Sequence, residues 1–148
     1  MTTRFRQLRS AKRGELRSMM HELSYEDPST ELITDKKISL TIRELSNNPN
    51  RGRIVVFEEG KAAIGYAILI PYWSNEYGGN ILHIDELYVK PEHRGRGIAT
   101  RFIKQILRSK QGTVAFQLEV TPTNTRAKNY YGKLGFRKSR NLHLIRKI

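Results

Sequence analysis

The sequence predicts an α/β fold, an α+β mixed sheet in which most strands run antiparallel and about four helices flank the sheet. The segments 53–57 and 62–70 flank Glu58-Glu59-Gly60-Lys61, a good hairpin turn, and begin an antiparallel meander that continues to Val89. A strand, a helix and a strand then follow one another between residues 81 and 120, and this order predicts one parallel pair. Two amphipathic segments precede all of these strands.

The elements before the meander are predicted from short patterns. The segment from Phe5 to Leu8 alternates and is a candidate first strand. Ser10 is a candidate N-cap for a first helix, which Asp27-Pro28-Ser29 ends and whose apolar side is formed by Leu16, Met19, Met20 and Leu23. Asp35 is a candidate cap for a second helix that ends near residue 47, with apolar spacing at Ile38, Ile42 and Leu45.

The elements after the hairpin follow the same logic. We expect residues 71–80 to be a connecting loop, residues 98–109 a helix, residues 114–120 a strand and residues 125–134 another helix. Terminal strands are expected near Phe136 and over residues 142–146. Length and composition suit one domain, residues 1–148.

Composition excludes several kinds of site. The chain has no cysteine, and its four histidines lack metal-ligand spacing, so we expect no metal. The N-terminus lacks the apolar core of a secretory signal, and no apolar run could span a bilayer, so a cytoplasmic location with no membrane partner is the default expectation.

The formal charge of +13 is distributed unevenly. Residues 1–80 hold 12 Lys and Arg against 10 Asp and Glu, whereas residues 81–148 hold 15 against 4. Such a field would attract a polyphosphate ligand or a nucleic acid, and a solvated basic surface without a specific partner is the plain alternative.

The basic half contains a glycine-rich turn between a predicted strand and a predicted helix. Unpaired N–H groups and the helix dipole favour an anion at such a helix start. Gly95 and Gly97 let the backbone approach a phosphate, while Arg94 and Arg96 could add charge-assisted hydrogen bonds. A basic surface turn is one alternative. A dinucleotide fingerprint with Glu119 as its acidic residue is another, but Thr100 replaces the third glycine.

A second motif lies over residues 124–136. Asn124 stands at the start of the last predicted helix, Ala127 and Tyr131 share one face of it, and Gly135 ends it. A small residue one turn from a phenol leaves room for a slim ligand. The alternative is an ordinary amphipathic helix with Tyr130 or Tyr131 in the core.

Together the two segments resemble the GNAT superfamily of N-acetyltransferases. Arg94-Gly95-Arg96-Gly97-Ile98-Ala99 is similar to that family's acetyl-coenzyme A motif, and Asn124, Ala127, Tyr131 and Gly135-Phe136 are similar to its second motif. The resemblance implies a parallel strand pair splayed at the cofactor site. It also implies that the backbone from Arg94 to Ala99 holds the pyrophosphate and that Leu87, Tyr88 and Val89 pair with pantetheine.

The remaining implied cofactor contacts are Thr100, Asn124, Ala127, Tyr130 and Tyr131. Tyr131 would be the general acid that protonates the departing thiolate, with Tyr130 as the neighbouring alternative. The attacking amine must also lose a proton. Strict alternation along the strand would place His83, Asp85 and Leu87 on one face, and Ile84, Glu86 and Tyr88 on the other. Asp85 is the first candidate base and Glu86 the second, with His83 or a water as alternatives.

Substrate recognition is expected from the aromatic segment 71–80. Tyr72, Trp73 and Tyr77 could line an acceptor pocket together with His83, while Glu76 could attract a cationic amine. A loop folded over its own apolar cluster, or a homodimer contact, would use the same residues.

The sequence therefore predicts an N-acetyltransferase that moves acetyl from acetyl-CoA to a primary amine of a small molecule, protein or peptide. A basic nucleic-acid-binding module is disfavoured, because the basic residues gather around a small-anion turn and the aromatics lie elsewhere. A GNAT domain that binds acetyl-CoA without the usual chemistry is the third alternative. The identity of the amine acceptor is left open.

Overall fold

The computed structural model describes residues 2–109 and 112–148. It contains two compact units that divide between Leu118 and Glu119, and each is described by itself. The expectation of one domain over residues 1–148 stays a prediction.

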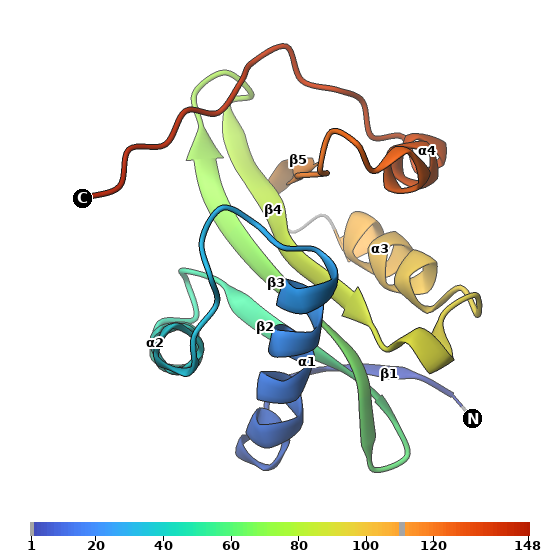
Figure 1. Ribbon diagram of the computed structural model, residues 1–148. Coiled ribbons are helices and arrows are strands. Elements are labelled where there is room, and N and C mark those ends of the chain that lie inside the picture. The colour runs from blue at the N-terminus through green and yellow to red at the C-terminus, as the bar shows by residue number, and fades with distance from the viewer. Residues whose placement is uncertain (1, 110–111) are drawn as a thin grey trace. The chain divides into compact units, whose positions relative to one another are not determined.

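The first unit is built on a mixed sheet of five strands in the order β1-β2-β3-β4-β5. Their bounds are β1 Arg4–Gln7, β2 Arg53–Glu59, β3 Ala62–Ser74, β4 Gly79–Val89 and β5 Thr113–Leu118. Neighbours from β1 to β4 pair antiparallel, and β4 pairs with β5 in parallel (Figure 1). The predicted meander and the single parallel pair are confirmed.

Helices cover both faces of this sheet (Figure 1). On one face lie the short helix η1 (Ser10–Lys12), α1 (Arg13–Glu26) and α2 (Asp35–Asn47), and their apolar sides pack on Ile54, Val56, Tyr66, Ile68 and Tyr88. On the other face, Phe102 of α3 (Ile98–Ser109) meets Phe5 and Phe57 in edge-to-face and tilted contacts. Such aromatic contacts add to the burial of apolar area that stabilises the sheet and its helices.

The two predicted helix caps differ from those observed. Ser10 lies inside η1, and the residue before α1, Lys12, makes no capping hydrogen bond with its side chain. The hydroxyl of Thr34 accepts from the Lys37 amide at 3.2 Å, so Thr34 is the N-cap of α2 and Asp35 its first residue. Both Thr34 and Asp35 are suitable cap residues, and the backbone conformation decides between them.

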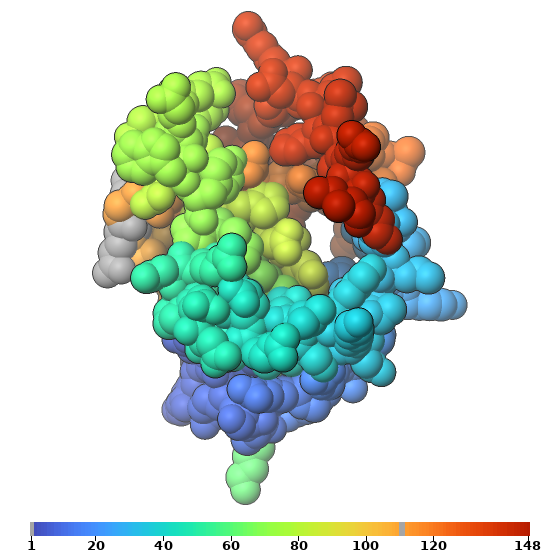
Figure 2. Space-filling model, turned by 90° about the vertical axis from the view of Figure 1, so that its left-hand side faces the viewer, coloured from blue at the N-terminus to red at the C-terminus, as the bar shows by residue number. Residues whose placement is uncertain are grey.

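The expected loop over residues 71–80 is wrong in extent. β3 continues to Ser74 and β4 begins at Gly79, so only residues 75–78 turn. The long β3–β4 hairpin stands out in yellow-green above the cyan α2 in Figure 2. Pairing with a neighbouring strand keeps Tyr72 and Trp73 extended, opposite Ile81 and Asn80.

The second unit contains α4 (Thr125–Lys133), close to the predicted helix. The Asn124 side chain accepts from the Ala127 amide at 3.0 Å, and Gly135 has a φ of +95° after the helix, as its C-terminal role requires. The predicted terminal strands are wrong: the structure has no strand over residues 136–148. Leu142 and Leu144 alternate but are exposed, and alternation without a pairing partner does not make a strand.

Candidate functional site

The two halves of β4 have different neighbours. β3 pairs with β4 along its whole length, whereas β5 pairs only from Asn80 to Ile84. In the described part of the first unit, no strand pairs with Asp85–Val89 on the β5 side. Alternate backbone groups of a strand point to each edge, so this half offers free N–H and C=O groups to an extended ligand.

A β-bulge marks the boundary between these halves. Ile68 pairs with Glu86 and the next residue, Leu69, pairs with Ile84, so Asp85 is an extra residue in β4. The predicted alternation is therefore wrong beyond this point. His83 shares the face of Glu86 and Tyr88, because their partners Ile70, Ile68 and Tyr66 alternate regularly along β3.

The bulge brings together three titratable groups predicted near the reaction. His83 Nε2 lies 3.4 Å from Asp85 Oδ1, and the Asp85 side chain is half exposed. The Tyr66 hydroxyl donates to Glu86 Oε1 at 2.6 Å. Burial raises the pKa of Glu86 and the charge of Asp85 adds to this rise, while the Tyr66 hydrogen bond opposes it. A carboxylate in this setting has a greater affinity for a proton.

The free half of β4 leads directly into the glycine-rich turn. The 3₁₀ helix η2 (Pro91–His93) follows β4, and then Gly95 and Gly97 adopt φ values of +75° and +70°. A Cβ at either glycine would meet no atom within 4 Å, so the backbone faces open space there. The first hydrogen bond of α3 runs from the Arg101 amide to the Gly97 carbonyl. The preceding amides at Gly97, Ile98 and Ala99 therefore have no helical acceptor.

Each of the two arginines of the turn forms an ion pair with a carboxylate of the protein. Arg94 donates to the Val89 carbonyl at 2.8 Å and pairs with Glu26 of α1 at 2.7 Å. Arg96 pairs with Glu59 at 2.7 Å. Hydrogen bonds from Arg96 and then Thr3 lower the pKa of Glu59, so this carboxylate is ionised. Both arginine side chains are nevertheless about two-fifths exposed, so their expected contacts to pyrophosphate stay a prediction, beside the backbone N–H groups of the turn.

Two of the three side chains before the turn, those of Tyr88 and Val89, are buried. Tyr88 is buried, and its hydroxyl donates to Glu22 of α1 at 2.7 Å. Val89 is also buried, whereas Leu87 is partly exposed. Alternate residues of this segment present their backbone groups to the edge without a β5 partner, and the Val89 carbonyl already accepts from Arg94. The pairing of Leu87, Tyr88 and Val89 with pantetheine stays a prediction.

In the second unit, α4 carries the predicted phenol acid. The ring of Tyr131 contacts Tyr130 and Phe136 edge-to-face, with centroids 5.1 and 5.9 Å away. Burial raises the pKa of Tyr131 to about 12, and Tyr130 contributes to this rise. At neutral pH the phenol keeps its proton, which is the state that a general acid needs. Ala127 lies one turn earlier on the same helix face.

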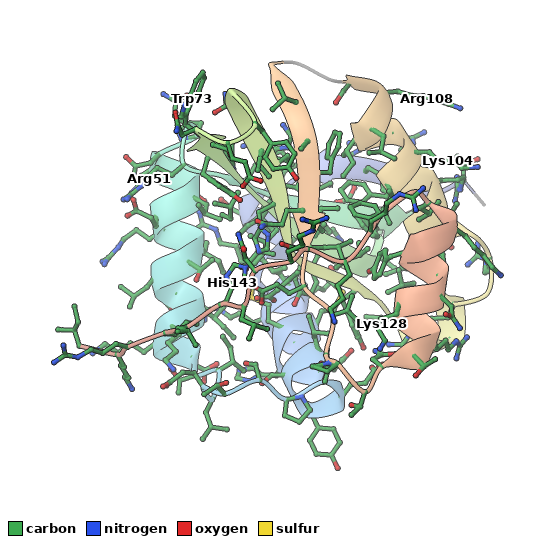
Figure 3. The ribbon with its side chains drawn as sticks, turned by 90° about the horizontal axis from the view of Figure 1, so that it is seen from above. Arg51, Trp73, Lys104, Arg108, Lys128 and His143 are labelled. Carbon is green, nitrogen blue, oxygen red and sulfur yellow. The ribbon has the colours of Figure 1, made fainter. Side chains whose placement is uncertain are left out.

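The aromatic residues expected to share one pocket do not share one face. Tyr72 and Trp73 are consecutive strand residues and point to opposite sides of the sheet. The Tyr72 hydroxyl donates to Gln117 Oε1 of β5 at 3.0 Å, while Trp73 is 66% exposed at the rim of the molecule (Figure 3). Tyr77 is exposed in the turn. Tyr72 lies on the face of His83, because Ile70, which pairs with His83, is two residues away.

Sequence reasoning missed five partners that fix these groups: Tyr66, Gln117, Glu22, Glu26 and Glu59. Each lies 20 or more residues from the group it contacts. No local motif could have found them, because the sheet register and the position of α1 bring them together.

Among residues 2–109 and 112–148, no three His, Cys, Asp or Glu side chains gather as metal ligands would. None of the described helices is long and apolar enough to cross a bilayer.

Comparison with known proteins matches residues 16–136 to the model of the acetyltransferase (GNAT) family. A thialysine N-epsilon-acetyltransferase of Mus musculus is 27% identical over 143 residues, which cover 90% of this chain and 84% of that protein. The crystal structure of a possible acetyltransferase from Clostridium difficile 630 has a TM-score of 0.84 at 23% identity and covers 100% of this chain and 99% of its own. The aminoglycoside N-acetyltransferase AAC(6')-Iy in complex with CoA has a TM-score of 0.79 at 19% identity and covers 99% and 95%. These two structures establish the similarity of fold.

Proposed function

The chain belongs to the acetyltransferase (GNAT) family, and from this premise we propose that it transfers acetyl from acetyl-CoA directly to a primary amine of a small molecule, protein or peptide. One observation carries the proposal: the half of β4 without a β5 partner leads into a glycine turn whose backbone faces open space. A ligand with an amide-containing arm and a pyrophosphate needs backbone N–H and C=O groups for the arm, followed by N–H donors for the pyrophosphate. When bound, acetyl-CoA supplies the activated acetyl group as a thioester.

The chain's own groups bind the ligand mainly through the backbone. Amides from Gly95 to Ala99 hold the pyrophosphate, and Leu87 to Val89 offer hydrogen bonds to the pantetheine arm. Arg94 and Arg96 support the turn through Glu26 and Glu59 and add positive potential from a distance. Thr100, Asn124, Ala127 and Tyr130 stay proposed cofactor contacts.

Asp85 is the proposed base. It is the extra residue of the bulge and half exposed, so an amine from solvent can reach it, and His83 is near enough to relay or share its proton. Glu86 is the second candidate, since its raised pKa favours proton uptake although Tyr66 occupies one oxygen. Tyr131 is the proposed acid for the thiolate.

For the acceptor, we infer a flexible side-chain amine as the first class to test. The mouse relative is named for the ε-amine of thialysine, and it aligns with most of this chain. Tyr72 and His83 on one sheet face, with Trp73 and Tyr77 at the hairpin end, are the proposed recognition residues. A thiol-release screen over thialysine, lysine, polyamines, aminoglycosides and peptides with free N-termini would identify the acceptor.

Thermal shift with acetyl-CoA tests the proposal, because a ligand that binds the folded chain raises its melting temperature. We expect a shift with acetyl-CoA and none with a short DNA duplex. The reverse result would favour the nucleic-acid-binding alternative.

Tyr131→Phe then tests the chemistry. We expect an unchanged thermal shift and a kcat lowered by about hundredfold, since general acid catalysis typically contributes this much. Tyr25→Phe, at an exposed position of α1, is the matched control and should retain activity. Full activity of Tyr131→Phe would move the acid role to Tyr130 or water, and binding of acetyl-CoA without turnover of any amine would favour the third alternative.

A further inference from the structure

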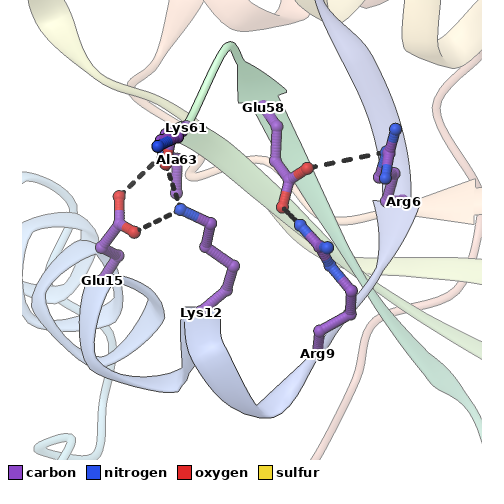
Figure 4. A network of polar contacts seen from close by, with 7 residues as sticks. All are labelled: Arg6, Arg9, Lys12, Glu15, Glu58, Lys61 and Ala63. Atoms are coloured by element: carbon purple, nitrogen blue, oxygen red, sulfur yellow. Dashed lines mark hydrogen bonds and ion pairs between the residues drawn. The ribbon is translucent and has the colours of Figure 1, made fainter.

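A basic hollow lies at the β1 edge of the sheet, and the proposed transfer reaction does not use it. Its volume is about 650 Å³, within the size range of small-ligand sites. We call it the edge hollow; it is lined by Thr2, Arg4, Arg6, Arg9, Lys12, Glu58, Gly60 and Lys61. Figure 4 draws Arg6, Arg9, Lys12, Glu58 and Lys61 of this lining.

The charges of the edge hollow are unbalanced. Five cationic residues line it, against one carboxylate, Glu58. Glu58 accepts from Arg9 at 2.7 Å and lies 3.7 Å from Arg6, so this single carboxylate serves two guanidinium groups. Among the described residues, the side chains of Arg4 and Lys61 have no ion-pair partner. The hollow therefore has unneutralised positive charge to offer to a ligand.

The floor of the edge hollow is held in place by a second set of contacts. Lys12 is almost fully buried, and its ammonium group donates to Glu15 at 2.7 Å and to the Lys61 carbonyl (Figure 4). The other Glu15 oxygen accepts from the Ala63 amide at 2.7 Å. Burial would raise the pKa of Glu15, but these hydrogen bonds outweigh it and the pKa lies below its ordinary value. The first turn of α1 is thus fixed to the β2–β3 turn, and the cationic groups need little reorganisation to bind.

The edge hollow is separate from the glycine turn. Glu58 and Glu59 are consecutive residues of β2 and point to opposite faces of the sheet. Glu58 faces the hollow, whereas Glu59 holds Thr3 and Arg96 on the other side. A ligand in the hollow would therefore meet different residues from those proposed for acetyl-CoA.

We propose that the edge hollow is a second anion site, which binds a small ligand with several phosphate groups, such as a triphosphate or diphosphate. The Arg4 guanidinium can donate paired hydrogen bonds to phosphate oxygens, and Lys61 adds a point charge. Arg6 and Arg9 add positive potential while they pair with Glu58. A small ligand fits better than a nucleic acid, because Lys104 and Arg108 lie on α3, on the other face of the sheet, and do not extend the hollow into one stripe (Figure 3).

Isothermal titration with tripolyphosphate tests this proposal, in the absence and in the presence of saturating CoA. The variant Arg4→Gln/Lys61→Gln removes the two cations that have no ion-pair partner, so the Glu58 and Glu15 contacts stay intact. Its matched control is Lys36→Gln/Arg43→Gln, which removes the same charge from exposed positions of α2. We expect affinity at least about tenfold weaker in the first variant only, as the loss of one or more charge-assisted hydrogen bonds predicts.

Three results would overturn the proposal. Equal weakening in both double variants would show a general effect of net charge. Loss of tripolyphosphate binding when CoA is present would assign the site to the cofactor. Binding of an acidic peptide with the same dependence on Arg4 and Lys61, but no binding of tripolyphosphate, would make the hollow a protein-docking surface.

Discussion

The first and second halves of β4 belong to one strand but have different neighbours in the sheet. Residues Asn80–Ile84 are paired on both sides and belong to the interior of the sheet. After the bulge residue Asp85, residues Glu86–Val89 are paired by β3 alone, and η2 then leads to the glycine turn. In the first half, backbone N–H and C=O groups on both edges pair with neighbouring strands. In the second half, the groups on the β5 side have no strand partner and are available to a ligand.

The comparison shows how one strand can bring titratable side chains together at a change in strand pairing. The doubly paired half fixes the direction of the chain, and the bulge then changes which side chains face which way. Because Asp85 is the extra residue, His83, Asp85 and Glu86 come together at the point where β5 pairing stops. The site is therefore a boundary between two kinds of strand pairing.

The largest expected effect comes from the carboxylate at this boundary. Asp85→Asn keeps the size of the side chain but removes the proposed base, so kcat should fall by about hundredfold. Glu86→Gln should have a smaller effect. Steady-state kinetics with the acceptor found in the screen measures both, and a larger loss in Glu86→Gln would transfer the role to that residue.

Two glycine variants separate folding from binding. Gly79→Ala at the start of β4 places a Cβ 2.5 Å from the Val114 side chain, and Gly97→Ala imposes a Cβ at a φ of +70°. We expect each to destabilise the chain by about 1–2 kcal/mol. Only Gly97→Ala should weaken acetyl-CoA binding, by about tenfold, because its Cβ enters the space proposed for pyrophosphate.

Denaturant titration and calorimetric binding of acetyl-CoA measure these two effects. Equal loss of cofactor affinity in both glycine variants would show that general destabilisation, rather than the glycine turn, controls binding.

The smallest expected effect is a change in the pKa of Glu86. The Tyr66 hydroxyl stabilises the ionised form of Glu86, so Tyr66→Phe should raise the pKa of Glu86 further. Carbon-detected NMR of the carboxyl group measures it. Tyr72→Phe is the control, because its phenol contacts Gln117 instead. If the acidic limb of the pH–rate profile moves to higher pH in Tyr66→Phe, Glu86 is the base; an unchanged limb supports Asp85.

The main elements followed from local patterns in the sequence. The spacing of Ile38, Ile42 and Leu45 predicted α2, and the order of strand, helix and strand predicted the parallel pair. The prediction of terminal strands was wrong because alternation at Leu142 and Leu144 does not specify a pairing partner. The predicted extent of the aromatic loop was wrong because Tyr72 and Trp73 belong to β3 and pair with residues beyond the turn.

The sequence by itself determined the order of elements, the glycine turn and the phenol on α4, because caps, turns and helix periodicity depend on neighbours within a few residues. Tertiary structure alone decided that Asp85 is a bulge residue, that Arg94 and Arg96 are held by Glu26 and Glu59, and that five basic residues surround the edge hollow. Sheet register and long-range ion pairs join residues that are distant in the chain. Each depends on which strands and helices meet, which no local pattern specifies.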